Sequence, residues 1–416
     1  DHQVSLLYLL HESQTEVALR ECFRKEAPDL VLHSSVTSQF PYVRELAERI
    51  RARWPGVPQF CGGAHPSLCP KDLAGTAFDG FIRGEGEEVL LNLIEDLSTG
   101  NDWRLRPNVV SMDPGGVRCN PLRPFIPDLD LLPWPDRDLF PTPFLVSRDH
   151  DTLRFLFSRG CPFRCTYCAN HALSALATGT YVRRRSPENA CSEIDDVLRR
   201  YPATFLAFDD DILTLDKVWL ETFLGLFVRH VRRPFACNVR PGTADASVFR
   251  LLAQAGCRVV GMGVESGDER IRREVLGRSL SDDQIQRSVD LARKEGLLVK
   301  TYNLAGLLGE TPEGLCATLR LNQRLRVDDS SLSLFFPYPG TLLGDKVLEG
   351  DPACVERAIR ERDESPLRDL PLSGEGMGRW KSRFNTMRIK GQEGLPGSGE
   401  RNLLWAEALT EGTGAS

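Results

Sequence analysis

Residues 158–168 read Ser-Arg-Gly-Cys-Pro-Phe-Arg-Cys-Thr-Tyr-Cys and directly follow the apolar run 153–157, which predicts a strand. The stretch holds three thiols, Cys161, Cys165 and Cys168, spaced four and three residues apart on one predicted loop. An iron–sulfur cube has four irons, so three thiolates leave one iron with a coordination position for a ligand that is not a protein side chain. The spacing therefore predicts a cluster with one open iron.

Two other thiol sites are compatible with part of this spacing. A Cys-x-x-Cys pair also occurs in zinc sites and in redox dithiols. His171 lies three residues beyond the last cysteine and could supply a fourth zinc ligand. A disulfide framework is not expected, because the 12 cysteines are spread over a long chain that is rich in apolar residues.

The composition limits the class of protein. A chain of 416 residues with 41% hydrophobic and 26% charged residues predicts two domains of ordinary size. The net charge is −6 and the basic residues are dispersed, which argues against a nucleic-acid partner. No apolar run reaches the roughly 18 residues that cross a bilayer. We therefore expect a cytoplasmic protein without a membrane span.

Residues 1–105 alternate between predicted strands and helices, which indicates a doubly wound, Rossmann-like α/β domain. The predicted strands are 4–10, 29–35, 57–62 and 78–82, and the predicted helices are 15–25, 42–53 and 87–97. Ligands of such domains bind beyond the carboxyl ends of the strands, where glycines let a backbone approach a planar ligand. The candidates at these ends are Ser35, Thr37, Gly62, Gly63, His65, Gly84, Glu85 and Gly86.

Three further regions follow. Residues 106–150 are rich in proline and aspartate and predict an extended linker. Residues 151–345 contain six strand–helix units and predict a partial (β/α)6 barrel, whose chemistry lies at the carboxyl ends of its strands. Residues 346–416 predict a short and partly disordered C-terminal region. The predicted barrel strands are 153–158, 204–208, 234–239, 258–264, 298–304 and 331–336.

Polar or small residues follow the barrel strands at the ends where chemistry is expected. Asp209 and Asp210 follow the second strand, although an acidic turn that caps the next helix explains them equally well. Glu265 lies beside glycines after the fourth strand, where a buried carboxylate needs a partner. The basic run 183–185 is predicted to be a solvated face. The other candidates at the strand ends are Arg240, Ser266, Gly306 and Glu310.

These motifs resemble the radical S-adenosylmethionine (SAM) enzymes, whose CxxxCxΦC signature fits the cysteine loop with Tyr167 as the aromatic residue. The resemblance implies a [4Fe-4S] cluster whose open iron takes the amino and carboxylate groups of SAM. It also implies a one-electron reductant, such as flavodoxin or ferredoxin, and cleavage of SAM to a 5′-deoxyadenosyl radical. The residues that it assigns to SAM binding are Tyr167, Asp209, Asp210, Arg240, Glu265, Ser266, Gly306 and Glu310.

The N-terminal pattern is similar to the cobalamin-binding domain that precedes the barrel in one large subfamily. The similarity rests on Pro-Asp-Leu-Val at 28–31, Gly-Gly-Ala-His-Pro-Ser at 62–67 and Gly-Glu-Gly-Glu at 84–87, and it implies that the eight strand-end candidates lie near cobalamin. The first strand–helix unit of such a domain is not recognised, so we expect the chain to be a fragment of a longer protein. The DxHxxG motif that supplies a lower axial histidine is also absent, and His65 is not expected to replace it.

The resemblance implies a cobalamin-dependent methyltransferase that acts on an unactivated carbon of a small organic or natural-product substrate. An oxidative cyclase or rearrangement enzyme, of the anaerobic magnesium-protoporphyrin monomethyl ester cyclase type, is an alternative because its pattern is much the same. A protein that binds a cluster without catalysis and keeps a vestigial cobalamin domain is a third hypothesis. Methylthiotransferases of tRNA are not favoured, because neither their extra cysteine triad nor a basic RNA-binding module is seen.

Overall fold

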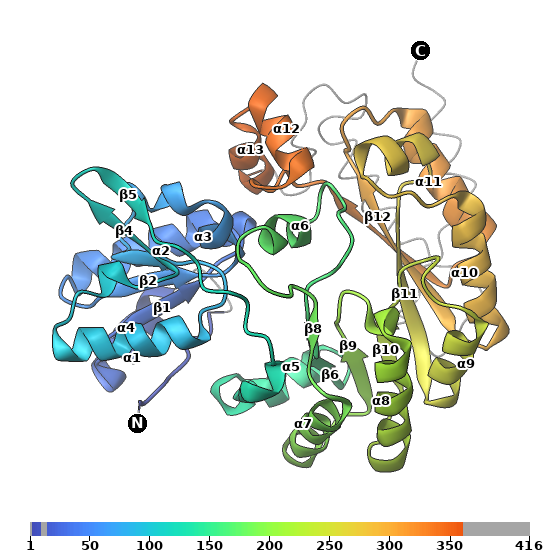
Figure 1. Cartoon of the computed structure of the whole chain (residues 1–416), viewed down its shortest axis with the longest axis horizontal. Coiled ribbons are helices and arrows are strands. Elements are labelled where there is room, and N and C mark those ends of the chain that lie inside the picture. Colours follow the sequence, from blue (N-terminus) through green and yellow to red (C-terminus); the bar gives the residue numbers. More distant parts are fainter. Residues whose placement is uncertain (1, 10–14, 361–416) are drawn as a thin grey trace.

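The two largest β-sheets of the described residues, one of five strands and one of six, lie in opposite halves of the molecule (Figure 1). This computed structural model describes residues 2–9 and 15–360. We call the half built on the five-stranded sheet the N-terminal domain and the half built on the six-stranded sheet the barrel. The helix predicted by the apolar residues at 403–409 lies outside the described residues.

The N-terminal domain has the strand order β1-β2-β3-β4-β5, with β1 to β3 parallel and the β4–β5 hairpin antiparallel. Its strands are β1 (Val31–Ser34), β2 (Gln59–Gly62), β3 (Gly80–Ile82), β4 (Val109–Asp113) and β5 (Gly116–Cys119). Its helices are α1 (Thr15–Glu26), α2 (Phe40–Arg53), α3 (Ala64–Leu68) and α4 (Glu87–Thr99). The predicted Rossmann-like alternation of strands and helices is therefore present from α1 to α4.

The predicted strand at 4–10 is not formed by residues 2–9. Val4, Leu6 and Tyr8 are 66%, 42% and 43% exposed, so their apolar side chains have no sheet face to cover. A strand also needs a neighbour, and within the described residues the edge strand β1 pairs with β2 alone.

The structure also differs from the extended linker expected at 106–150. The first part of this region supplies β4 and β5, because Val109 and Val110 are fully buried against the sheet. Pro114 and Gly115, which lie within the predicted linker, form the hairpin turn between these strands. The last part forms the short helix α5 (Thr142–Arg148).

The barrel has the strand order β13-β12-β11-β10-β9-β6 and all its neighbouring strands are parallel, so the six predicted barrel strands are confirmed. The strands are β6 (Thr152–Phe155), β9 (Phe205–Phe208), β10 (Phe235–Asn238), β11 (Cys257–Glu265), β12 (Leu298–Ala305) and β13 (Asp329–Leu334). The helices that cover them are α7 (Pro187–Arg200), α8 (Lys217–His230), α9 (Ala246–Gln254), α10 (Asp282–Lys294) and α11 (Pro312–Leu325). Because β6 and β13 are both edges among the residues that the structure describes, this part of the barrel is open on one side.

Local sequence signals explain where these helices begin. The side chain of Ser186 accepts a hydrogen bond from the Asn189 amide, and Pro187 occupies the first turn of α7. Thr311 caps α11 in the same way, and Ser281 forms a capping box with Gln284 at α10. These caps set the lengths of the loops that precede the helices.

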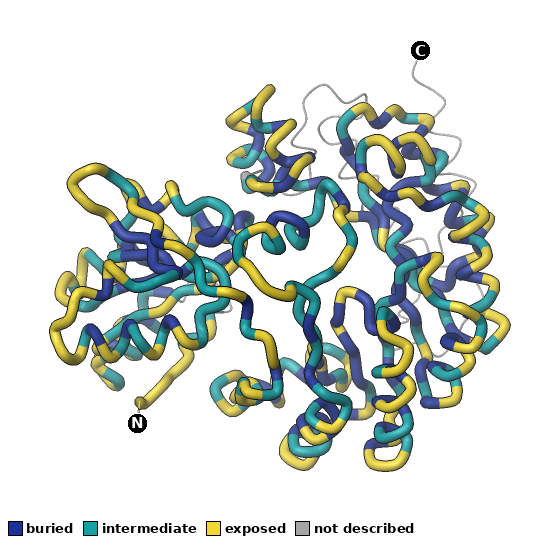
Figure 2. Tube along the Cα trace, in the orientation of Figure 1, coloured by how far each residue is buried: buried dark blue, intermediate teal, exposed yellow. Residues whose placement is uncertain are grey.

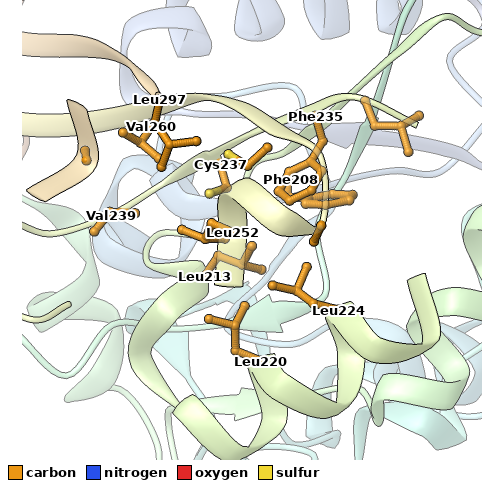
Figure 3. Packing of buried hydrophobic residues seen from close by; sticks show 14 of the residues in the cluster. Phe208, Leu213, Leu220, Leu224, Phe235, Cys237, Val239, Leu252, Val260 and Leu297 are labelled. Carbon is orange, nitrogen blue, oxygen red and sulfur yellow. The ribbon is translucent and has the colours of Figure 1, made fainter. Parts of the chain in front are cut away.

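The barrel core lies between the sheet and its helices. Phe208, Phe223, Phe227 and Phe235 are at most 1% exposed and form a chain of ring contacts with centroids 4.9 to 5.9 Å apart. Figure 3 shows Phe208 and Phe235 beside the aliphatic residues of the same cluster. Figure 2 shows that buried residues are concentrated in the central strands of each half, such as β2 and β3 or β9 and β11, while the outer faces of the helices are exposed. This rigid packing fixes the carboxyl ends of the strands, where the loops of interest begin.

Candidate cluster and cofactor site

The cysteine loop lies at the mouth of the barrel and is fastened on several sides. A two-stranded ribbon, β7 (Ser158–Arg159) with β8 (Arg183–Arg184), closes its start, and α6 (Ala169–Ser174) follows its end. Gly160 adopts φ of +89°, and a Cβ atom there would lie 2.7 Å from the Tyr181 carbonyl oxygen, so only glycine fits. The Thr166 amide donates to the Leu276 carbonyl at 3.1 Å and anchors the loop to the segment after β11.

The three thiols differ in their surroundings. Cys165 is buried, whereas Cys161 and Cys168 are half-buried. Burial raises the pKa of the Cys161 and Cys168 thiols, and the carboxylate of Asp211 adds to the effect on both. The side chain of Asn170 donates to Cys168 Sγ at 3.6 Å. The loop therefore presents one buried and two accessible sulfurs.

Two guanidinium groups approach the buried sulfur. Arg240 Nη1 lies 3.7 Å and Arg278 Nη1 3.8 Å from Cys165 Sγ. Arg240 also lies over the ring of Phe163, 3.9 Å from its centroid. Positive charge beside a thiolate stabilises its ionised form. The predicted residue Arg240 is thus brought to the cysteine loop, and Arg278 joins it.

The predicted residue Glu265 belongs to the same buried group. Its Oε1 lies 3.6 Å from Arg278 Nη1, and Arg278 Nη1 is 3.4 Å from the Tyr167 hydroxyl. Burial raises the pKa of Glu265, while Arg278 and Tyr167 oppose that rise. Glu265 also has φ of +71°, an unfavourable conformation for a residue with a side chain, and such strain is concentrated at functional sites.

Sequence reasoning missed Arg278, the partner that the buried glutamate requires. Arg278 is separated from Glu265 by the π-helical turn η8 (Ile271–Val275), and no spacing rule links the two residues. The residue before Arg278, Gly277, adopts φ of +62° in a sharp turn beside the cysteine loop, and a glycine at this place in the sequence indicates no more than a turn.

The three consecutive aspartates after β9 have different partners. Asp209 pairs with Arg154 at 3.1 Å, and Asp210 accepts hydrogen bonds from the Phe157 amide at 3.2 Å and from the Ser158 hydroxyl. Asp211 accepts from Asn170 at 3.1 Å and influences the thiols. The structure therefore brings Asp211, which was not among the predicted residues, close to the thiols, whereas Asp210 bonds to Ser158 at the start of the loop and Asp209 pairs with Arg154.

The last predicted strand-end residues form a tight turn after β12. Glu310 Oε2 accepts from the amides of Gly306 at 2.7 Å and Leu307 at 3.3 Å. Glu310 Oε1 is buried and has no hydrogen-bond partner among the described residues, and burial raises the pKa of Glu310 to about 7. Ser266 is fully buried, and its side chain accepts from the Asp268 amide at 3.2 Å. Glu310 thus offers an acceptor to a ligand, whereas Ser266 is used within its own loop.

His171, the alternative zinc ligand, is engaged at both ring nitrogens. The Leu342 amide, at the start of α12 (Leu342–Gly350), donates to Nε2 at 3.2 Å, so Nε2 carries the lone pair. Nδ1 must then carry the proton, and it donates to the Cys165 carbonyl at 3.0 Å. The zinc alternative therefore loses its fourth ligand at the cysteine loop.

The predicted strand-end loops of the N-terminal domain face the barrel mouth. Tyr338, after β13, makes a side-chain hydrogen bond with Ser38, next to the loop that holds Ser35 and Thr37. Leu68 of α3 packs on Gly340, where a Cβ atom would lie 3.3 Å from that of Leu68. The loop with Gly84 and Gly86 reaches the barrel through Glu85. All three loops therefore contact the half that carries the cysteines.

The contact through Glu85 is an ion-pair network. Arg159 Nη1 donates to Glu85 Oε1 at 2.7 Å, Arg183 Nη1 donates to Oε2 at 3.0 Å, and the Ile126 amide donates to Oε2 at 2.7 Å. Although burial raises it, these partners leave the pKa of Glu85 below its usual value. Arg183 is only 4% exposed, so the predicted solvated face at 183–185 is wrong at this position. Glu85 holds the two halves together and has little acceptor capacity left for a cofactor.

The other N-terminal candidates are close to one another. Gly63 adopts φ of +99°, and a Cβ atom there would lie 2.6 Å from the Ser35 carbonyl oxygen, so the first two loops touch. Thr37 Oγ1 lies 3.3 Å from His65 Nδ1, and both residues are buried. Gly62 leaves a Cβ position with no neighbour nearer than 3.8 Å. The backbone rather than the side chains is therefore presented at this edge of the sheet.

A cavity of about 260 Å³ lies within the curved six-stranded sheet. Its lining includes Asn238, Tyr302 and the charged pairs Arg154–Asp209 and Lys300–Asp329. This volume suits a small organic molecule. Within the described residues, no helix is long and apolar enough to cross a membrane.

Comparisons with known proteins define the class. The model of the Radical SAM superfamily matches residues 155–321, and that of the B12 binding domain matches residues 2–94. The chain therefore carries a B12-binding domain followed by a radical SAM domain, the class of enzyme that the cysteine loop predicts. The predicted resemblance and the predicted fold are confirmed.

Particular relatives share most of this chain. It is 28% identical to an uncharacterized methyltransferase of Pyrococcus horikoshii over 82% of this chain and 74% of that protein. It is 24% identical to the anaerobic magnesium-protoporphyrin IX monomethyl ester cyclase of Rubrivivax gelatinosus over 80% of this chain and 61% of that protein. The radical SAM methyltransferase TsrM of Kitasatospora setae has the same fold, with a TM-score of 0.67 at 23% identity over 82% of this chain and 68% of that one.

Proposed function

We propose that this chain is a cobalamin-dependent radical SAM methyltransferase that transfers a methyl group to an unactivated carbon of a small organic substrate. One observation carries the proposal. All three strand-end loops of the B12-binding domain contact the mouth of the barrel, through Ser38, Leu68 and Glu85, so a cofactor at those strand ends would face the cysteine loop. The match to a methyltransferase over most of the chain supports the reaction type.

The residues of the cysteine loop fit a [4Fe-4S] cluster. Three thiols lie on a loop that is fastened at both ends, and His171 is not free to act as a fourth ligand. Arg240 and Arg278 supply positive charge beside Cys165, which lowers the cost of holding thiolates in a partly buried site. When bound, such a cluster would supply one electron to SAM, whose cleavage gives methionine and a 5′-deoxyadenosyl radical.

The fit to SAM rests on two buried carboxylates. Glu310 Oε1 is an acceptor without a partner among the described residues, and a donor group of the SAM nucleoside would satisfy it. Glu265 and Tyr167 lie with Arg278 on the same side of the cysteine loop. We propose that these residues orient SAM. We also propose that Asp211, rather than Asp209 and Asp210, is the aspartate after β9 that contacts SAM.

The fit to cobalamin rests on backbone. Gly62, Gly84 and Gly86 lie at the strand ends and present no side chain, so a planar ring can approach them. Glu85 bonds to Arg159 and Arg183, so we assign to it the positioning of the N-terminal domain against the barrel. His65 contacts Thr37 within its own domain and is not assigned to cobalamin.

The oxidative cyclase remains a second candidate. The match to the magnesium-protoporphyrin ester cyclase covers 80% of this chain, which favours it over a non-enzymatic role. Both candidates share the cluster and SAM cleavage and differ in whether a methyl group is transferred.

Anaerobic reconstitution with iron, sulfide and hydroxocobalamin tests the proposal. After desalting, about four irons and about one corrinoid per chain are expected. Cys165→Ala should lose the iron, and Cys119→Ala, which changes an exposed thiol of β5, should keep it. Iron without corrinoid would contradict methyl transfer.

A second measurement separates the two enzymes. Reduced protein that holds corrinoid is incubated with SAM carrying a deuterated methyl group, and the corrinoid is analysed by mass spectrometry. Labelled corrinoid together with S-adenosylhomocysteine supports the methyltransferase. A corrinoid that stays unlabelled while SAM is cleaved supports the cyclase.

A further inference from the structure

A second cluster of ligand-type side chains lies outside the cysteine loop. It consists of His65 on α3, Asp72 on the short helical turn η3 (Pro70–Leu73) and Cys69, which lies between these two elements. One nitrogen, one sulfur and one carboxylate oxygen of these residues lie within 4.8 Å of one another. The Cys69 amide donates to the His65 carbonyl at 2.7 Å, and this turn places both side chains on one side of the segment.

The imidazole of His65 is held in one orientation. It is 3% exposed and stacks on the ring of Phe40 with centroids 3.8 Å apart. Its Nδ1 lies 3.3 Å from Thr37 Oγ1, the kind of second contact that orients a metal-binding histidine. This arrangement points Nε2 toward Asp72.

His65 Nε2 is buried and has no hydrogen-bond partner among the described residues, although Asp72 Oδ2 is only 3.3 Å away. When Nδ1 carries the proton and donates to Thr37 Oγ1, the lone pair of Nε2 faces the Asp72 carboxylate, and a bound cation would lie between them. Two acceptors at this distance are unfavourable unless a cation lies between them. The half-buried thiol of Cys69 completes a mixed donor set.

We propose that His65, Cys69 and Asp72 bind a zinc ion. Zinc accepts nitrogen, sulfur and oxygen ligands together, and three protein ligands leave a fourth position for water. Asp345 of α12 is a further carboxylate at this place, near enough to Cys69 to raise the pKa of its thiol. The ion would fix the segment after Gly62 and Gly63 against the barrel, at a site separate from the iron.

Metal analysis of the full-length protein, isolated anaerobically and dialysed, tests the proposal. About one zinc per chain is expected in addition to the iron. Asp72→Asn and Cys69→Ser should lose the zinc and keep the iron, whereas Cys161→Ala should lose the iron and keep the zinc. Cys22→Ser, which changes a half-buried thiol of α1, is the matched control and should keep both.

Cobalt titration gives a readout that a merely structural role would not change. Co²⁺ bound by wild-type protein should show a sulfur-to-cobalt charge-transfer band, and Cys69→Ser should abolish it. Thr37→Val should weaken zinc binding by roughly 10- to 100-fold, because Thr37 orients the imidazole. Asp72 is about half exposed, so Asp72→Asn should keep the native circular dichroism spectrum. Wild-type protein without zinc, or a cobalt spectrum that is unchanged in Cys69→Ser, would overturn the proposal.

Discussion

The two halves of this chain use residues after strands in different ways. In the barrel, Arg240 and Glu265 meet at the cysteine loop, together with Arg278. In the N-terminal domain, Glu85 and His65 also follow strands, but they contact the protein itself. A polar side chain at the end of a strand therefore predicts where a site lies but does not show that this side chain binds a cofactor. In the N-terminal domain the glycines, which offer only backbone, remain the better candidates for cofactor contact.

The largest expected effect concerns a glycine of the barrel. A Cβ atom at Gly267 would lie 2.2 Å from the carbonyl carbon of Ala317, and a helix backbone cannot move away easily. We expect Gly267→Ala to lower the free energy of unfolding by more than about 4 kcal/mol, as measured by urea denaturation.

Gly86→Ala is the matched change in the N-terminal domain. The nearest atom to its Cβ would be a methyl carbon of Ile82 at 3.6 Å, so the cost should be below about 1 kcal/mol. Equal losses for the two variants would show that the contact with α11 is less rigid than described.

The buried ion pair of the barrel gives the next effect. Arg278→Ala would leave Glu265 buried without its cation, and we expect a loss of about 3 to 5 kcal/mol in urea denaturation of the cluster-free protein. Arg273→Ala removes an arginine whose side chain is 63% exposed and should change stability by less than about 0.5 kcal/mol. A small effect of Arg278→Ala would mean that Glu265 is neutral.

The corresponding ion pairs of the N-terminal domain are those of Glu85 with Arg159 and Arg183. Glu85→Gln keeps the shape of the side chain but removes its charge from Arg159 and from the buried Arg183, so we expect a loss of about 2 to 3 kcal/mol. Glu88→Gln alters a side chain that is 62% exposed and should cost less than about 1 kcal/mol. If Glu85 were instead a cofactor ligand, the substitution would lower corrinoid retention and leave stability nearly unchanged.

The smallest effect is a dependence on pH. The raised pKa of Glu310, about 7 against an ordinary 4.5, means that folding favours its protonated form. The protonated Glu310 carboxyl therefore contributes its full share of folding stability below about pH 4.5. This share is lost as the pH rises through about 7, where the buried carboxyl ionises. We expect wild type to lose about 2 kcal/mol more than Glu310→Gln between about pH 5 and pH 7.5. An equal dependence in both proteins would contradict this account of Glu310.

The sequence predicted the elements whose signals are local. The barrel strands were found because buried parallel strands are short apolar runs, and α7 was found through Ser186 and Pro187. The β4–β5 hairpin was missed because Pro114 and Gly115 suit a turn as well as a linker. The predicted strand at 4–10 failed because an apolar pattern does not supply a neighbouring strand.

In the candidate site, too, the residues that are neighbours in the sequence were predicted and those that come from distant segments were not. The three thiols lie on one loop, so their proximity follows from the sequence alone. Asp211 reaches that loop from the end of β9 and Arg278 from the segment after η8, and only the tertiary structure brings them there. Likewise, nothing in the run 183–185 indicates that Arg183 is buried against Glu85.

The central claim is that the cysteine loop holds an open-iron cluster that cleaves SAM. The most direct test is to reduce the reconstituted protein anaerobically, add SAM and measure 5′-deoxyadenosine by mass spectrometry. We predict that wild type and Cys119→Ala form 5′-deoxyadenosine and that Cys165→Ala forms none. Wild-type protein that retains about four irons per chain and yet forms no 5′-deoxyadenosine would contradict the claim.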